Sequence, residues 1–589
     1  MGEQIVRSVD AERRGTRPGF VAGSPRAVLV LAVVALLGCL LVWAAQASVG
    51  AQGSASISGT VLTAEGQPVA GATVRRQTAT NHVTTASDGS FTLGGLTAGQ
   101  AVTITAWLDG YYVAWQMVTP PGQGIKLTLR PYPTTDNPSY QWYSSTDPQG
   151  ALSCLHCMVA FPEWQAGAHA QSAMNPRFFS MYNGTDINGT VPITPGYKLD
   201  LPGTAGNCAN CHAPGAGSRF QGAFTADMNG LRAGAEREGV FCEFCHKILD
   251  VYLNPATGLP YPNAPGVLSY RLVRTSGANV LFLGPLDDVT RRVSFLPLEK
   301  KSQFCAACHQ FSFWGTPIYE SFKEWKESPY PARGIECQTC HMPPETVPYF
   351  VFPQIAGSLV RDPSTLASHL DLGVKDPDFM RKTVAMTVTA QITGTNLSVA
   401  VSLTNVFAGH HVPTDYPGRN MILVVRVTDG DGQPCEQSSG PVVPDWGGLG
   451  ALANDYAGQA GKGYAKILRD RETGQWPVIS YWKQAFIHSD NRIPAGATDV
   501  SYYEFRLPGE AGAHVASLEG RDLRNVASIR SLGSSEVHVE ATLWFRRLFI
   551  AQAREKGWDT PDLDIAHAEA VFPVLIELES QVPHNGGEE

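Results

Sequence analysis

The sequence predicts a multidomain chain with an N-terminal β-sandwich, an irregular middle domain of mostly α and coil structure, and a C-terminal β-sandwich. Its 589 residues exceed what one hydrophobic core usually holds, so several cores are expected. Apolar and polar residues alternate near both ends of the chain, whereas the middle is rich in Cys, Gly and Pro. We expect separate units at residues 1–50, 55–131, 137–380 and 381–580. Residues 131–150, rich in Pro, Ser, Thr and Asp, have the composition of a linker.

Residues 1–50 have the composition of an export segment. Five arginines lie within the first 26 residues, and residues 27–47 then carry no formal charge. This apolar stretch is borderline between a cleaved signal peptide and a retained membrane anchor. Ala45-Gln46-Ala47 offers a cleavage site, and Cys39 is a weaker candidate for lipid attachment. We expect the rest of the chain on the periplasmic or extracellular side, either anchored in the cytoplasmic membrane or secreted.

The charge balance argues against a nucleic-acid partner. The chain has 53 acidic and 44 basic residues, which gives a formal charge of −9. Nothing in the sequence resembles the basic groove that a phosphate backbone requires.

Residues 55–131 read as short strands separated by turns. The expected strands are Ile57–Val61, Val69–Val74, Asp88–Leu93 and Val102–Ala106. The segments Gln67-Pro68-Val69-Ala70-Gly71-Ala72 and Asp88-Gly89-Ser90-Phe91 resemble the carboxypeptidase regulatory-like domain. The resemblance implies a non-catalytic spacer or docking unit.

Period-two alternation returns after residue 381 and predicts the second sandwich. The expected strands are Val384–Val388, Leu397–Leu403, Met421–Val427, Tyr503–Leu507 and Val537–Leu543. A Gly-rich insertion is expected at Gly440–Gly463 and a helix at Leu548–Gly557.

Four copies of the pattern Cys-Xaa-Xaa-Cys-His lie in the middle domain, where composition predicts about 0.006 by chance. In one helical turn the two thiols and the imidazole project from one side, so the thiols can bind porphyrin vinyl groups while the histidine binds iron. We therefore expect four copies of haem c. The thiols are Cys208, Cys211, Cys242, Cys245, Cys305, Cys308, Cys337 and Cys340, and the iron ligands are His212, His246, His309 and His341.

Two other uses of these thiols were weighed. The Cys pairs could form zinc ribbons, Cys208/Cys211 with Cys242/Cys245 and Cys305/Cys308 with Cys337/Cys340, or a disulfide framework. Neither use requires a histidine after every second cysteine, so haem attachment is the favoured interpretation.

A fifth element, Cys154-Leu155-His156-Cys157-Met158, has both thiols but Met in the histidine position. It predicts a fifth haem with Met158 or another residue on iron, a relic of a lost site, or a catalytic haem with altered ligation. His156 is either a ligand to a neighbouring haem or a solvated loop residue.

The remaining motifs resemble the multihaem cytochromes related to the tetrahaem cytochromes of ammonia oxidisers. The resemblance spans roughly residues 137–430 and includes Cys340-His341-Met342-Pro343, Ser368-His369 and Ala408-Gly409-His410. It implies that His169, His369 and His410 are distal iron ligands, with His411 as an alternative to His410. The chain departs from these relatives at Met158, where they carry histidine.

Three functions were considered. Haems with two strong ligands leave no free iron position, which favours an electron carrier between a membrane donor and a soluble or extracellular acceptor, working with redox protein partners. An oxidoreductase acting on small nitrogen or sulfur compounds at the atypical first haem is the alternative. A filament-forming cytochrome is a third hypothesis, in which the chain oligomerises.

Overall fold

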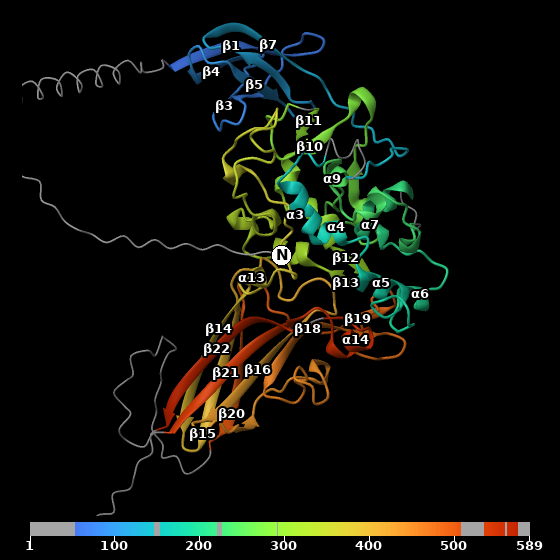
Figure 1. Cartoon of the computed structure of the whole chain (residues 1–589), viewed down its shortest axis with the longest axis vertical. Helices are drawn as coiled ribbons and strands as arrows, with labels where there is room; N and C mark the ends of the chain where they lie inside the picture. Colours follow the sequence, from blue (N-terminus) through green and yellow to red (C-terminus); the bar gives the residue numbers. More distant parts are fainter. Residues whose placement is uncertain are drawn as a thin grey trace, which may run out of the picture.

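The computed structural model describes residues 54–145, 154–220, 226–290, 292–507, 535–559 and 562–574. The molecule is a crescent in which the N-terminal strands, the middle region and the C-terminal strands follow one another (Figure 1). This order confirms the predicted fold class.

The N-terminal part is a sandwich of two sheets around an apolar core. One sheet has the order β4-β1-β7 and the other β3-β2-β5-β6. Ile57, Val61 and Leu127 are almost fully buried between them. The strands are β1 (Ser54–Thr63), β2 (Thr73–Arg76), β3 (His82–Thr84), β4 (Ser90–Thr97), β5 (Val102–Trp107), β6 (Ala114–Val118) and β7 (Gly122–Leu129).

The middle region has short helices and two-stranded pairs joined by long loops. The helices are α3 (Ala160–Ala166), α4 (Ala168–Gln171), α5 (Pro176–Asn183), α6 (Tyr197–Asp200), α7 (Ala209–His212), α8 (Pro214–Gly217), α9 (Cys242–Cys245), α10 (Gln303–His309), α11 (Ser321–Lys326), α12 (Cys337–His341) and α13 (Pro377–Met380). The strands are β8 (Ile248–Val251), β9 (Tyr270–Leu272), β10 (Phe282–Gly284), β11 (Val293–Phe295), β12 (Phe311–Phe313) and β13 (Thr316–Tyr319).

Single turns of 3-10 helix connect these elements. They lie at Ser218–Phe220, Met228–Gly230, Ala235–Arg237, Gly266–Ser269, Gly277–Asn279, Pro297–Lys300, Pro331–Arg333 and Pro363–Thr365, with one more in the C-terminal part at Asp445–Gly447. Such short, irregular pieces fit a region whose core is not built from side chains alone.

The C-terminal part is a second sandwich, with sheets β14-β15-β20-β17 and β19-β18-β16-β21-β22. Its core includes Leu397, Val401, Leu423 and Leu543, all fully buried. The strands are β14 (Val384–Thr393), β15 (Asn396–Asn405), β16 (Asn420–Asp429), β17 (Glu436–Ser439), β18 (Gly461–Asp470), β19 (Ala485–Asp490), β20 (Thr498–Arg506), β21 (Ser535–Arg546) and β22 (Leu563–Val574), with helix α14 at Ile550–Glu555.

The sequence predicts five of the nine strands described in this part and the helix, but not β17, β18, β19 or β22. Strand β18 begins inside the expected Gly-rich insertion and is buried along most of its length. A strand that is covered on both faces does not alternate between apolar and polar residues. The pattern used for the other strands therefore could not detect it.

The segment expected to be a linker, residues 131–150, is ordered against the middle region where it is described. It lacks regular secondary structure, but Tyr140 is only 8% exposed and its ring contacts Trp142. Trp142 in turn contacts the rings of Phe241 and Phe244 beside α9. Its aromatic residues, which the linker interpretation overlooked, explain this packing.

A loop of the middle region fixes the N-terminal sandwich. The backbone N–H of Thr78 donates to Asp288 Oδ2 at 2.7 Å, and Arg75 pairs with Asp287 at 2.9 Å. Arg361 binds both oxygens of Asp288, whose side chain is 2% exposed. A buried carboxylate with charged and backbone donors is well satisfied, which makes this a specific contact.

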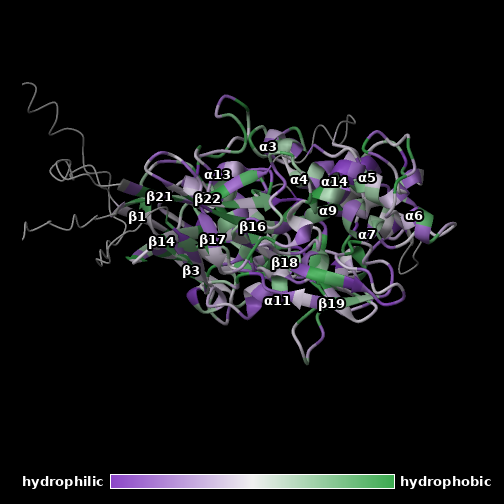
Figure 2. Ribbon diagram, turned by 90° about the horizontal axis from the view of Figure 1, so that it is seen from below, coloured by the Kyte–Doolittle hydropathy of each residue, from purple (hydrophilic) through white to green (hydrophobic). Residues whose placement is uncertain are grey.

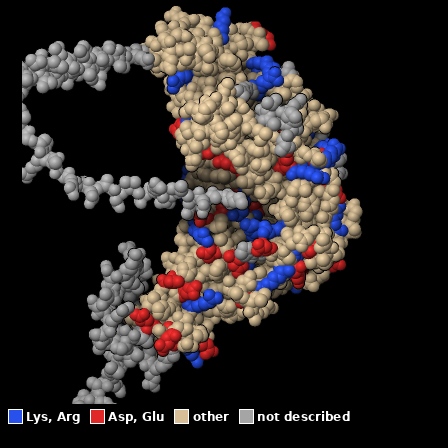
Figure 3. Space-filling view, in the orientation of Figure 1, with Lys and Arg blue, Asp and Glu red and all other residues tan. Residues whose placement is uncertain are grey.

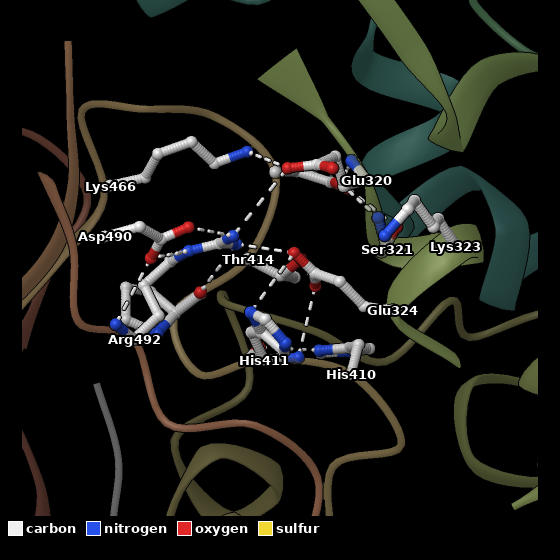
Figure 4. A network of polar contacts seen from close by, with 12 residues as sticks. Glu320, Ser321, Lys323, Glu324, His410, His411, Thr414, Lys466, Asp490 and Arg492 are labelled. Carbon is white, nitrogen blue, oxygen red and sulfur yellow. Dashed lines mark hydrogen bonds and ion pairs between the residues drawn. The ribbon is translucent and has the colours of Figure 1, made fainter. Parts of the chain in front are cut away.

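A buried ionic network joins the C-terminal sandwich to the middle region (Figure 4). Helix α11 is largely hydrophilic in Figure 2, yet it buries Glu324, whose side chain is 4% exposed. Arg492 Nη1 lies 2.6 Å from Glu324 Oε1, and its other nitrogens bind Asp490. Although desolvation opposes ionisation, Arg492 holds the pKa of Glu324 below its ordinary value.

The same Glu324 carboxylate holds the loop after β15. Its Oε2 accepts the His411 N–H at 3.1 Å and the Thr414 hydroxyl at 2.6 Å. Asn405, which is fully buried, donates to the His410 carbonyl at 2.8 Å and accepts from the Ala408 N–H at 3.0 Å. The loop that carries His410 is therefore fixed from both sides.

Charges of both signs are interspersed where the middle region meets the C-terminal strands on the face shown in Figure 3. None of the described helices is long and apolar enough to span a membrane. The expected export segment, residues 27–47, lies outside the described residues.

We predict that Arg492→Met destabilises the C-terminal sandwich strongly, because it leaves Glu324 buried without its partner. Removing one member of a buried ion pair costs about 3–5 kcal/mol. Denaturant unfolding followed by tryptophan fluorescence measures the change. Arg381→Met is the control, since Arg381 and its partner Asp564 are 45% and 49% exposed and such a pair is worth under about 1 kcal/mol. Equal losses in the two variants would contradict the role of the network.

Candidate haem-binding site

Each Cys-Xaa-Xaa-Cys-His segment forms one short helical turn. In the first, the His212 N–H donates to the Cys208 carbonyl at 2.9 Å, and in the second, His246 donates to Cys242 at 3.0 Å. The third and fourth segments lie within α10 and α12. Bonds of this kind place the two thiols and the imidazole on one side of the turn, as the sequence predicts.

The turns of α10 and α12 are tied together at their beginnings. Glu336 caps α12, and its carboxylate also accepts the Ser302 N–H at 2.9 Å and the Ser302 hydroxyl at 2.7 Å. Ser302 Oγ accepts the Cys337 N–H at 2.9 Å, and Ser302 is fully buried. As a result, the thiols of Cys305 and Cys337 come into contact.

Thiol contacts link neighbouring turns. A hydrogen bond with Cys337 raises the pKa of Cys305, and one with Cys308 raises the pKa of Cys211. The α9 turn also adjoins α10, because Phe244 and Phe304 both contact the ring of Tyr270, at 5.7 and 6.4 Å. The Cys305–His309 turn is thus a junction with three neighbours.

This arrangement differs from the zinc ribbons considered above. Each contact joins one thiol from each of two turns, whereas a ribbon needs both thiols of two turns around one ion. Among the described residues, no group of three or more His, Cys, Asp or Glu side chains is placed to hold a metal ion. The described cysteines are free thiols.

The fifth element folds as a tight turn and not as a helix. The Cys157 N–H donates to the Cys154 carbonyl and the Met158 N–H to the His156 carbonyl, each at 3.0 Å. A hydrogen bond with Cys242, together with desolvation, raises the pKa of Cys154. This turn therefore joins the others through the same kind of thiol contact.

His341 and His410 face each other across the junction of the middle region and the C-terminal sandwich. Their ring centres are 6.3 Å apart and their planes differ by 15°. Metal–imidazole bonds of about 2 Å on opposite sides of one ion place two ring centres roughly 6 Å apart. The spacing therefore fits two axial ligands of one iron.

The hydrogen bonds of His341 and His410 leave the Nε2 atom of each ring available to bind a metal. His341 Nδ1 lies 2.6 Å from the Leu372 carbonyl, and His410 Nδ1 lies 2.9 Å from the His411 carbonyl. A carbonyl only accepts, so Nδ1 carries the proton and Nε2 keeps its lone pair for a metal. Desolvation lowers the pKa of His341 to about 4, which keeps the ring neutral.

The structure distinguishes His410 from His411, which the sequence left as alternatives. His411 Nδ1 lies 3.7 Å from Glu324 Oε1, within the ionic network, whereas His410 faces His341. His411 thus contributes to the contact between the C-terminal sandwich and the middle region, and His410 has the geometry of an iron ligand.

Buried carboxylates accompany His309 and His246. Desolvation opposes the charge on both rings, but Asp415 raises the pKa of His309 to about 9 and Glu299 raises the pKa of His246 to about 9. The side chains of Asp415 and Glu299 are 8% and 9% exposed.

His169 and His369 lie on either side of Asp371. His169 Nδ1 is 2.9 Å from Asp371 Oδ2, and its carbonyl accepts the Val240 N–H at 3.0 Å. Gly239, with a φ of 66°, must be glycine because a Cβ there would lie 2.1 Å from the His169 carbonyl oxygen. Desolvation, followed by the charge of His246, lowers the pKa of His369 to about 4. His369 therefore lies near the α9 turn.

His212 has different surroundings. Phe178 stacks on its ring, with centres 4.2 Å apart and an interplanar angle of 29°. Desolvation lowers the pKa of His212 to about 4, so the imidazole is neutral and able to bind a metal. Phenylalanine carries no ligand atom, so this contact supplies no second iron ligand.

Two functional candidates escaped the sequence reasoning, namely Asp371 and Asp415. Asp415 Oδ2 lies 3.3 Å from His309 Nδ1, and its side chain is 8% exposed. Each aspartate follows a predicted distal ligand within five residues. This closeness in sequence could have marked the two aspartates as candidates, but it does not reveal which histidine each one binds, because that depends on tertiary structure.

We predict that the carboxyl pair beside His369 contributes stability that is lost as the pH rises from about 5 to 8. Glu163 accepts the His369 N–H at 2.8 Å, and burial together with the Glu163 charge raises the pKa of Glu345 from 4.5 to about 7. The folded protein thus keeps a proton that the unfolded chain releases at lower pH, so this contribution is lost as that proton leaves. The unfolding free energy of the unaltered protein minus that of Glu345→Gln should fall over this range, and a constant difference would contradict this.

The N-terminal sandwich has a known relative. Residues 56–130 match the carboxypeptidase regulatory-like domain family. These residues form a carboxypeptidase regulatory-like domain. The resemblance stated from the sequence is therefore confirmed for this part of the chain.

The comparisons that extend beyond this domain are less close. No curated protein matches the chain. Among solved structures, a penta-heme cytochrome c552 from Thermochromatium tepidum is similar at 20% sequence identity and a TM-score of 0.48. The similarity covers 72% of this chain and 98% of that protein.

Proposed function

We propose that this chain is an extracytoplasmic multihaem c-type cytochrome that carries electrons between a membrane donor and a soluble or extracellular acceptor. The observation that carries the proposal is the pair of His341, in the fourth Cys-Xaa-Xaa-Cys-His turn, and His410, whose ring centres lie 6.3 Å apart with planes 15° from parallel. Redox proteins are the expected partners, and the N-terminal segment is the expected link to the membrane. The motif resemblance to the tetrahaem cytochromes of ammonia oxidisers stays a prediction.

The residues divide into three roles. The cysteine pairs would hold four haems by thioether bonds, and Cys154 and Cys157 a fifth. His212, His246, His309 and His341 would bind the irons on the near side, and His169, His369 and His410 are the proposed distal ligands. Bound haem supplies an iron that changes reversibly between two oxidation states.

The protein around these residues supports rapid transfer. Attachment points on neighbouring turns are in contact, so electrons need not cross a thick layer of side chains. Neutral imidazoles, such as those of His341 and His369, are ready to bind iron without first losing a proton. Buried backbone carbonyls and carboxylates orient the rings, which limits rearrangement when the charge on iron changes.

We propose five haems per chain, namely the four that the Cys-Xaa-Xaa-Cys-His motifs predict and the one that the sequence leaves open at Cys154 and Cys157. The pyridine haemochrome assay and the intact mass, measured on protein matured with a haem-attachment system, count the groups directly. Cys154→Ala/Cys157→Ala should lose one haem, whereas Cys435→Ala, which alters a thiol outside the turns, should lose none. A count of four in the unaltered protein would overturn the fifth site, and a colourless, fully matured protein would overturn the proposed function.

We predict that His410→Ala opens one iron to external ligands and that His411→Ala does not. The reason is the spacing of His341 and His410, whose ring centres are 6.3 Å apart and whose planes are nearly parallel. Carbon monoxide titration of the reduced protein should show one more equivalent bound in His410→Ala than in the unaltered protein. An extra equivalent in His411→Ala instead would assign the distal ligand to His411.

A further inference from the structure

Two aspartates bond at close range to proposed iron ligands, one of them in the junction turn. His309 Nδ1 lies 3.3 Å from Asp415 Oδ2, and His169 Nδ1 lies 2.9 Å from Asp371 Oδ2. The two carboxylates are 8% and 13% exposed, so solvent screens their charges weakly.

The remaining near-side and distal ligands donate mainly to neutral groups. The Nδ1 partners of His341 and His410 are the carbonyls of Leu372 and His411. His246 Nδ1 lies 2.7 Å from the Leu283 carbonyl, with Glu299 farther away at 3.6 Å. His212 Nδ1 is 3.4 Å from the Ser172 carbonyl. Glu299 is itself buried, so what distinguishes His309 and His169 is a carboxylate within 3.3 Å of Nδ1.

Asp415 acts on the junction turn directly, because it contacts His309 and His309 belongs to the turn of Cys305 and Cys308. Asp371 reaches the same part of the middle region through His169. Ala170, next to His169, packs in the same apolar cluster as Cys308.

The backbone at each aspartate has an unusual, left-handed conformation. Asp371 and Asp415 have φ values of 49° and 59°, in the left-handed region that non-glycine residues adopt infrequently. Asp415 is also held by the backbone N–H groups of Glu320 and Ser321, at 3.2 and 3.1 Å, and by the Ser321 hydroxyl. Strained residues that persist in a fold are often functional.

We propose that Asp371 and Asp415 make the haem attached at Cys305 and Cys308 the lowest-potential centre of the protein. The inference rests on the proposed function only in requiring haem at this turn. A carboxylate that accepts the Nδ1 proton makes the imidazole a stronger electron donor to a metal. A nearby buried negative charge also disfavours the addition of an electron. Both effects lower the reduction potential.

Asp→Asn substitutions test the proposal, because asparagine tolerates the left-handed backbone and can still accept a hydrogen bond. We expect Asp415→Asn and Asp371→Asn each to make the last-reduced haem at least tenfold easier to reduce, which is 59 mV for one electron. The double variant should shift further. Potentiometric titration followed by visible absorbance and electron paramagnetic resonance measures the change.

Two further variants make the outcome specific. Asp499→Asn alters an aspartate that pairs with Lys462 in the C-terminal strands, and it should leave every potential unchanged. His309→Met should shift the same last-reduced component, which assigns it to the junction turn. A loaded protein in which that component stays fixed in both Asp371 and Asp415 variants, or in which His309→Met shifts another component, overturns this inference alone. A lack of bound haem would overturn the proposed function instead.

Discussion

The buried ion pair between Arg492 and Glu324 is the contact on which the proposed site depends. Glu324 belongs to α11 of the middle region, and Arg492 follows β19 of the C-terminal sandwich. The same carboxylate binds His411 and Thr414, which lie in the loop between His410 and Asp415. Because two charges buried at 3% and 4% exposure must pair, the sandwich has little freedom to dock elsewhere. This one requirement places His410 opposite His341 and Asp415 beside His309.

The site is consequently shared between two parts of the fold. The middle region supplies the cysteine turns, whereas the C-terminal sandwich supplies a proposed distal ligand and a carboxylate. Any ligand that bridges His341 and His410 binds only the docked arrangement and therefore stabilises it. Conversely, the ionic network reduces the cost of bringing the second imidazole to the metal. Haem binding and domain docking should thus be coupled, even though Arg492 contacts no proposed iron ligand.

The sequence predicts the local part of this site better than the long-range part. The four Cys-Xaa-Xaa-Cys-His turns and the N-terminal domain follow from residues close together in the chain. The bond between His169 and Asp371 joins residues about 200 positions apart, and no periodicity encodes it. Strand β18 is buried along most of its length and so lacks the alternation that revealed β14 and β15. Composition alone predicts a linker at residues 131–150, whereas its tyrosine and tryptophan side chains indicate packing against the middle region.

The Cys305–His309 turn lies between three neighbouring turns, so the reduction potential of a haem bound there affects electron transfer among all of them. This turn meets α7 through Cys211, α12 through Cys337 and α9 through Tyr270. If the junction has the lowest potential, an electron passes through it by a brief uphill step and then rests on one of the outer sites. Each tenfold step in equilibrium constant corresponds to about 59 mV for one electron, so two carboxylates suffice to keep the junction mostly oxidised. Electrons would then collect on the branches, where a donor and an acceptor can reach them separately.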